Sequence, residues 1–157
     1  MSKIHSYSVI GVMSGTSLDG LDIIKCTFQK GYDWSFKIEE GITNKYSKNW
    51  FQLLKNSHKK TKELQKYDYL YGDYIGEQVK SFIKKNNFKV DLIASHGHTI
   101  FHQPKNKITL QIGSGQNIAN ITKTTTISDF RSLDVKLNGQ GAPLVPIGDL
   151  KLFQDHK

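Results

Sequence analysis

The stretch that decides the fold runs from residue 11 to residue 22 and reads GVMSGTSLDGLD. An apolar, β-type run at residues 7–12 leads into it, and a second such run at residues 21–28 follows. The glycines and hydroxyl residues between the two runs are typical of a tight turn. The stretch therefore predicts two adjacent strands joined by a polar turn.

The segments further along the chain predict an α/β domain. Residues 34–42 alternate apolar and polar side chains after a Gly-Tyr-Asp turn, which predicts a third strand and an antiparallel meander. Apolar residues three or four apart predict a long amphipathic helix over residues 61–83. Further strands are expected at residues 90–94, 108–112 and 124–128, with a short helix at 116–122. This order predicts a mixed sheet with flanking helices.

The predicted long helix carries two features that call for an explanation. Gly72 and Gly76 lie four residues apart, which predicts the close approach of a neighbouring element. Tyr67, Tyr71 and Tyr74 form a stripe that suits either the core or an aromatic binding surface, and helical spacing favours the core.

The composition narrows the class of protein. The chain has 157 residues with 37% hydrophobic content, which suffices for one domain with its own core. It contains no run of about 18 apolar residues and no secretion-type N-terminus, so a soluble cytoplasmic protein is expected, without membrane contact. The single cysteine, Cys26, is expected to pack as a small apolar residue.

The net charge of +8 is concentrated in one region. Eleven lysines but only four acidic residues lie between residues 45 and 89, and Arg131 is the only arginine among the 22 basic residues. Proteins that recognise a nucleic-acid sequence rely on the planar guanidinium group of arginine. A region rich in lysine and poor in arginine therefore favours a solvated helical surface. A basic nucleic-acid-binding domain is kept as a distant alternative, with salt-dependent binding as its test.

Polar and glycine residues collect where predicted strands end, at residues 14–22, 95–102, 113–116 and 129–143. Ligands of open α/β sheets bind at strand ends. The first of these turns could wrap phosphate oxygens, with Asp19 and Asp22 placed to hold magnesium directly or through water. Taken alone, such a turn is more typical of a plain hairpin, and it lacks the lysine of a Walker loop.

Two charged clusters are candidates for ligand binding. His96 and His98 are expected on one face of a strand exit, with His102 beyond a turn. They suit hydrogen bonding to a polar ligand or to a neighbouring loop better than a metal site. Arg131 lies between Asp129 and Asp134, which suits either a structural ion pair or recognition of a sugar acid.

Five motifs together resemble those of the anhydro-N-acetylmuramic acid kinases. The motifs are GVMSGTSLDGLD (11–22), SHGHT (95–99), TLQIG (109–113), DFR (129–131) and GQGAPLVP (139–146). Their order and spacing agree from residue 10 to residue 153. The resemblance implies the actin-like ATPase (ribonuclease H-like) fold of sugar kinases, in which two α/β lobes enclose ATP and substrate.

The resemblance also implies an activity and a set of site residues. Such kinases open the ring of 1,6-anhydro-N-acetylmuramic acid with water and phosphorylate the sugar to N-acetylmuramate 6-phosphate, in cell-wall recycling. It places Arg131, Asp129, His96 and His98 at the amino sugar and Asp19 at Mg²⁺. The residues implied to bind the ATP phosphates are Gly15, Thr16, Ser17, Leu18, Asp19, Gly20, Leu21 and Asp22.

The sequence departs from the family pattern in three ways. His98 stands where the family usually has glutamine, and Asn138 replaces a glycine, which suits ordinary or left-handed backbone. The family's second lobe follows the GAPLVP motif and brings the water-activating aspartate, so residues 1–157 are expected to form only the first lobe. No catalytic residue is assigned within them, and alone they are predicted to give no turnover. A noncatalytic module that binds a sugar or a protein partner is the alternative, and a homodimer of the full-length protein is left open.

Overall fold

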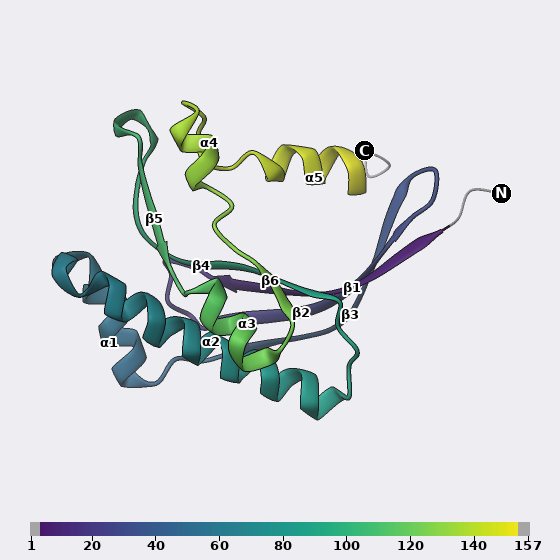
Figure 1. The fold of residues 1–157 in the computed structure, drawn as a ribbon, viewed down its shortest axis with the longest axis horizontal. Helices are drawn as coiled ribbons and strands as arrows, with labels where there is room; N and C mark the ends of the chain where they lie inside the picture. The colour runs from purple at the N-terminus through teal and green to yellow at the C-terminus, as the bar shows by residue number, and fades with distance from the viewer. Residues whose placement is uncertain (1–3, 154–157) are drawn as a thin grey trace.

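A mixed sheet of six strands forms the centre of the molecule, in the order β3-β2-β1-β4-β5, with β6 also paired to β4 (Figure 1). The computed structural model describes residues 4–153. The strands are β1 (His5–Ser14), β2 (Leu21–Lys30), β3 (Trp34–Asn44), β4 (Leu92–Gln103), β5 (Ile108–Ile112) and β6 (Thr125–Ile127). The predicted mixed sheet is confirmed, because β4 runs parallel to β1 and β6 whereas the other pairs are antiparallel.

The first three strands form the antiparallel meander that their alternation predicts. Ile10 on β1 and Leu21 and Ile23 on β2 are at most 1% exposed, since every second side chain points to the same face. Cys26 is buried, as expected of a small apolar residue.

The strand that carries the histidines is longer than its apolar run predicts. The predicted strand at residues 90–94 ends before the histidines, but β4 continues to Gln103, so that prediction is wrong. The reason is hairpin pairing with β5, which keeps polar residues extended that carry no strand pattern of their own. Gly97 interrupts the regular conformation with φ of 70°, and a Cβ there would lie 2.5 Å from the carbonyl oxygen of Ile112. Glycine therefore allows β5 to approach.

Helices cover both faces of the sheet, with α1, α2 and α3 on one side and α4 and α5 on the other (Figure 1). They are α1 (Lys48–Asn56), α2 (Leu64–Asn86), α3 (Gly115–Thr122), α4 (Ser132–Lys136) and α5 (Leu144–Leu152). Within residues 4–153, none of them combines the length and the apolarity that crossing a bilayer requires.

The long helix α2 supplies most of the core beneath the sheet. Tyr71, Ile75 and Val79 are completely buried, and Tyr67 is 7% exposed. Tyr74 is half-buried and stacks on Tyr71 with ring centroids 5.8 Å apart. The tyrosine stripe therefore belongs to the core, as its helical spacing predicts.

The two glycines of α2 form the contact with α3. A Cβ on Gly72 would lie 2.8 Å from the backbone nitrogen and oxygen of Ser114, and one on Gly76 would lie 3.0 Å from Ile121. The predicted close approach is confirmed, and it fixes the segment that follows β5 against the helix.

The lysine-rich region contains a helix that the sequence reading missed. Helix α1 begins after Ser47, whose hydroxyl accepts from the N–H of Trp50, and it buries Leu54. All eleven lysines of the region are exposed, on α1, on α2 and on the segments that precede, join and follow these helices. A solvated basic surface is therefore what the structure shows there.

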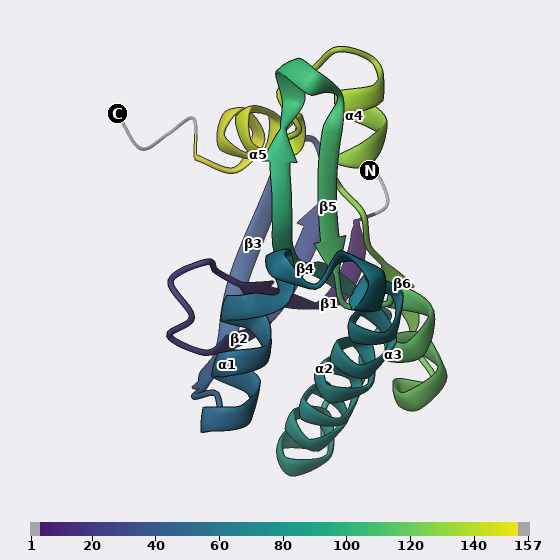
Figure 2. The same ribbon diagram turned by 90° about the vertical axis from the view of Figure 1, so that its left-hand side faces the viewer.

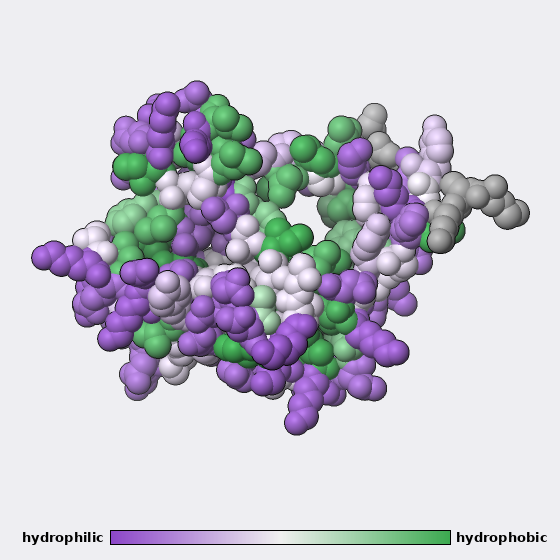
Figure 3. Space-filling view, in the orientation of Figure 1, coloured by the Kyte–Doolittle hydropathy of each residue, from purple (hydrophilic) through white to green (hydrophobic). Residues whose placement is uncertain are grey.

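The opposite face of the sheet is only partly covered. Leu144, Val145, Ile147 and Leu150 of α5 are each at least half exposed. Figure 3 shows an opening between this apolar helix and the sheet. The ring of Phe153 contacts Phe36 on β3, with centroids 5.3 Å apart.

Candidate functional site

The polar turn that the sequence singles out connects β1 to β2 (Figure 2). Ser14 and Leu21 pair across its base, so residues 15–20 form a closed loop. The N–H of Leu18 donates to the carbonyl of Gly15 over 3.2 Å. Leu18 has φ of 60°, a left-handed conformation that costs a leucine on the order of 1 kcal/mol or more. Its side chain packs against the core, which holds the turn in this shape.

The turn exposes donors that the protein itself does not use. The backbone N–H groups of Thr16, Ser17 and Asp19 have no acceptor among residues 4–153, and the first two residues also carry exposed hydroxyls. Successive free N–H groups in a tight turn form a concave site for anions. Phosphate oxygens are acceptors that could take up these donors, and phosphate binding by the turn stays a prediction.

The two aspartates of the turn differ in their surroundings. Asp19 is exposed and its carboxylate makes no hydrogen bond to any of the described residues, whereas Asp22 on β2 accepts from the hydroxyl of Thr43 over 2.6 Å. No group of three or more metal-ligating side chains occurs within the described part of the chain. One free carboxylate suits magnesium, which proteins often hold through one or two carboxylates together with substrate phosphates.

His96 on β4 and Arg131 form a hydrogen-bonded pair away from the turn. The Nε–H of Arg131 donates to Nε2 of His96 over 2.8 Å. Arginine has no acceptor, so His96 is neutral and carries its proton on Nδ1, which lies 3.1 Å from the carbonyl oxygen of Gly97. Burial is the main reason why the pKa of His96 is lowered; the charge of Arg131 adds to it, against the opposing bond to Gly97.

Arg131 forms no ion pair with Asp129 or Asp134, which rules out the structural alternative for this cluster. Asp129 accepts from the N–H of Ser132 over 3.1 Å, and Asp134 accepts from the N–H of Gly141 over 2.7 Å. Arg131 instead donates from Nη1 to the carbonyl of Gly141 over 2.9 Å. The carboxylates are engaged by nearby backbone amides, which leaves the guanidinium to bridge β4 and the segment after α4.

His96 and Asp129 line a shared polar pocket of about 260 Å³. Its wall is rich in hydroxyls and carboxylates, which suits a ligand with several hydroxyl groups. The polar side chains of this wall are Asp68, Ser95, His96, Gln111, Ser114, Ser128, Asp129 and Ser132.

Among the polar residues of this pocket that the sequence does not assign as individual ligand contacts, Ser95 and Asp68 stand out. Ser95 is completely buried, and its Oγ has no hydrogen-bond partner among the described residues. Asp68 on α2 accepts from the N–H of Gly113 over 2.8 Å; burial raises the pKa of its carboxyl, against that bond. Ser95 lies inside the SHGHT motif and could have been chosen there. Asp68 carries no signal, because acidic residues are common on exposed helix faces.

His98 lies apart from the other three predicted sugar-binding residues. Its Nδ1 is 3.1 Å from Oγ of Ser14, and it lines a different pocket together with Thr16 and Ser17 of the turn. His98 is 4% exposed, and burial, helped by the nearby His96, lowers its pKa to about 4. The structure therefore brings His96, Asp129 and Arg131 together, and it places His98 beside the turn.

The third histidine is not beyond a turn, as the sequence reading expects. His102 lies on β4, and its Nδ1 is 3.2 Å from the hydroxyl of Thr109 on β5. The expectation is wrong because β4 extends to Gln103. Asn138 has φ of 71°, the left-handed conformation that asparagine tolerates, as predicted.

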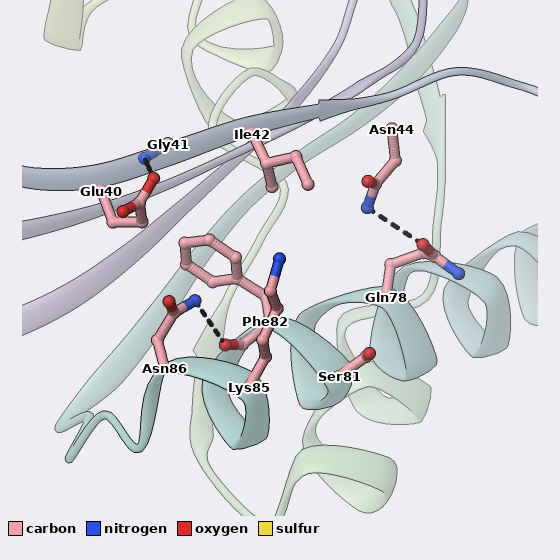
Figure 4. Close-up of a pocket in the computed structure, with 9 residues that line it drawn as sticks. All are labelled: Glu40, Gly41, Ile42, Asn44, Gln78, Ser81, Phe82, Lys85 and Asn86. Carbon is pink, nitrogen blue, oxygen red and sulfur yellow. Dashed lines mark hydrogen bonds between the residues drawn. The ribbon is translucent and has the colours of Figure 1, made fainter.

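A further pocket lies between β3 and the C-terminal half of α2 (Figure 4). Asn44 and Gln78 meet across it through a hydrogen bond of 3.0 Å, and the ring of Phe82 forms part of its wall. None of the predicted site residues lines this pocket. The predicted site residues line three other pockets: the polar pocket of His96 and Asp129, the pocket of His98 beside the turn, and a third that His96 and Arg131 line together with residues 141–145.

Comparison with known proteins identifies close similarities. The sequence model of the family described as "Anhydro-N-acetylmuramic acid kinase" matches residues 7–157. An "Anhydro-N-acetylmuramic acid kinase" of Bacillus cereus (strain AH187) is 39% identical over 160 residues, covering 94% of this chain and 42% of that protein. One of Bacillus thuringiensis (strain Al Hakam) is 38% identical over 165 residues, covering 97% and 43% respectively. The chain thus spans less than half the length of these curated relatives.

Proposed function

The chain belongs to the anhydro-N-acetylmuramic acid kinase family, and we propose that it is the lobe of such a kinase that holds the phosphates of ATP and one side of the amino sugar. The mixed sheet with flanking helices is consistent with a lobe of a sugar kinase or actin-like ATPase. The whole enzyme needs a second lobe, which would supply the opposite wall of the cleft.

The single observation that carries the proposal is the set of free donors in the turn. Thr16, Ser17 and Asp19 offer unpaired backbone N–H groups on a loop whose shape the structure fixes. Phosphate oxygens are acceptors only, so such a loop suits the phosphates of ATP. Asp19 would hold Mg²⁺, which neutralises phosphate charge when it is bound.

The polar pocket that His96 and Asp129 line supports the part of the proposal that concerns sugar binding. Within residues 4–153, the hydroxyl of Ser95 has no hydrogen-bond partner, and the carboxylate of Asp129 has none beyond its bond to Ser132. Arg131 keeps N–H groups beyond its two bonds to His96 and Gly141. An amino sugar with its lactyl carboxylate presents matching hydroxyls and an anion.

For the complete enzyme we propose the reaction that the resemblance implies. Water attacks the anomeric carbon, the bond from that carbon to the bridging oxygen breaks, and O6 accepts the γ-phosphoryl group of ATP. The products are N-acetylmuramate 6-phosphate and ADP, in a cytoplasmic cell-wall recycling route. This proposal assigns no water-activating carboxylate to residues 1–157, so we expect no turnover from them alone.

Binding and turnover test the proposal separately. Calorimetric titration of the chain with Mg²⁺-ATP should show binding that a Thr16→Pro/Ser17→Pro variant loses, because proline removes both N–H donors. A Tyr32→Pro variant, changed at an exposed residue of the β2–β3 turn, is the matched control. Equal binding by all three proteins would contradict the assignment of the turn. In the full-length kinase, sugar phosphorylation should disappear in the Thr16→Pro/Ser17→Pro variant alone.

A further inference from the structure

The pair of His96 and Arg131 forms part of the wall of an apolar pocket of about 220 Å³. Phe130 and residues 141–145 form the rest of this wall, and apart from a glycine they all carry apolar side chains. His96 also lines the polar pocket that it shares with Asp129. The pair therefore lies where an apolar pocket meets a polar one.

The guanidinium group of Arg131 keeps donors and a charge that the described part of the chain leaves unpaired. Its Nε–H donates to His96, and one N–H of Nη1 donates to the carbonyl of Gly141. A guanidinium has five N–H groups, so three remain. No carboxylate forms an ion pair with Arg131 among residues 4–153. A half-buried arginine in this state favours an anionic ligand that its planar group can meet with two N–H groups.

The position of Arg131 restricts the kind of anion that fits. Arg131 lines the apolar pocket and does not line the polar one, and no acidic residue lines the apolar pocket. A phosphate group has only polar surface and would leave the apolar side chains of residues 142–145 without a partner. A carboxylate with an alkyl group on the adjacent carbon presents an anion and an apolar surface side by side. Burying that alkyl group against the apolar wall removes it from water, which is favourable.

We infer that this pocket is a specificity site for a carboxylate with a methyl group on the adjacent carbon, with Arg131 at the carboxylate and Ala142 and Val145 at the methyl group. The inference rests on the proposed function, in which the lactyl substituent of the amino sugar is a group of this kind. A volume of about 220 Å³ accommodates so small a substituent, since a water molecule takes about 30 Å³ in the liquid. The sugar ring then extends past His96 into the polar pocket.

Two sugars that differ only in this substituent test the inference. 1,6-Anhydro-N-acetylglucosamine has a hydroxyl group where 1,6-anhydro-N-acetylmuramic acid has the lactyl group. In the full-length kinase we expect kcat/KM to be at least about 30-fold higher for the muramic acid, because only that sugar offers the carboxylate and the methyl group. Equal values would overturn this inference and leave the proposed kinase function in place. Phosphorylation of neither sugar would overturn both.

The Val145→Asp variant of the full-length kinase tests the pocket itself. The new carboxylate would repel the lactyl carboxylate and compete for Arg131, so the ratio of the two kcat/KM values should fall by about tenfold or more. A general loss of folding or of ATP binding lowers both values and leaves the ratio unchanged. Ile147→Asp is the matched control, because Ile147 is also at least half exposed on α5 but does not line the pocket.

The ratio in these two variants decides the assignment. An unchanged ratio in Val145→Asp would overturn it, and this is the result expected if the acetamido methyl group occupies the pocket instead. An equal fall of the ratio in Ile147→Asp would overturn it as well. If Val145→Asp fails to fold, Val145→Thr keeps the shape of the side chain and replaces one methyl group by a hydroxyl. That variant should lower the ratio by about threefold, and an unchanged ratio would again overturn the assignment.

Discussion

Arg131 donates a hydrogen bond of 2.8 Å to His96, a residue 35 positions earlier in the sequence. The bond connects β4 to the segment that precedes α4, and it sets the tautomer of His96 because arginine can only donate. Two predicted sugar-binding residues thus fix each other's state before any ligand arrives. Each of the following predictions depends on the surroundings of one residue in the structure.

Replacing Arg131 with lysine should abolish this arrangement without unfolding the protein. A lysine keeps the charge but cannot reach His96 and the carbonyl of Gly141 from one planar group. In the full-length kinase we expect kcat/KM for the anhydro-sugar to fall by about 100-fold, from lost positioning. Steady-state kinetics measures this, with Lys136→Ala on α4 as the control. Near-normal rates in Arg131→Lys would show that the pair does not face the substrate.

Replacing Asp19 with asparagine should affect turnover but not folding. Its carboxylate is exposed and makes no hydrogen bond within residues 4–153, so its removal breaks no contact of the fold. If Asp19 holds Mg²⁺, activity of the full-length kinase should fall by about 100-fold or more, since phosphoryl transfer depends on charge neutralisation. Asp33→Asn, at another exposed aspartate, should leave activity unchanged. Equal activity of both variants would contradict the metal assignment.

The stability of the protein should fall at mildly acidic pH. His98 takes up a proton near its ordinary pKa of 6.5 when unfolded, but near a pKa of about 4 when folded. Between these values the unfolded state binds more protons, so the free energy of unfolding decreases as the pH falls, in total by roughly 2–3 kcal/mol. Urea denaturation from pH 7 to pH 4 measures this decrease. The slope should become shallower in His98→Gln but not in His58→Gln, a change at an exposed histidine.

Two glycine-to-alanine changes within helices should act in opposite directions. In Gly72→Ala the new Cβ would lie 2.8 Å from the backbone of Ser114, so we expect a loss of about 1–3 kcal/mol of stability. In Gly148→Ala no atom lies within 4 Å of the new Cβ, so helix α5 should gain up to about 1 kcal/mol. Thermal denaturation compares the two directly. A stable Gly72→Ala variant would mean that α3 can move away from α2.

Much of the fold could be predicted because its signals are local. The apolar β-type runs of β1 and β2, the alternation along β3 and the helical spacing along α2 are properties of neighbouring residues, and these predictions are confirmed. Helix α1 was missed because its lysines were interpreted only as surface charge, although Trp50, Leu53 and Leu54 have helical spacing. The length of β4 was missed because pairing with β5, not composition, keeps His98 to Gln103 extended.

The sequence by itself determined the meander, the polar turn and the family to which the motifs belong, because each depends on residues close together in the chain. Only the tertiary structure decided which part of the candidate site each histidine lies beside. His96 meets Arg131 across 35 positions and His98 meets Ser14 across 84, and no local pattern encodes either partner. The proton position on the ring of His96 follows from its partner, since Arg131 can only donate and the ring nitrogen that it meets must accept.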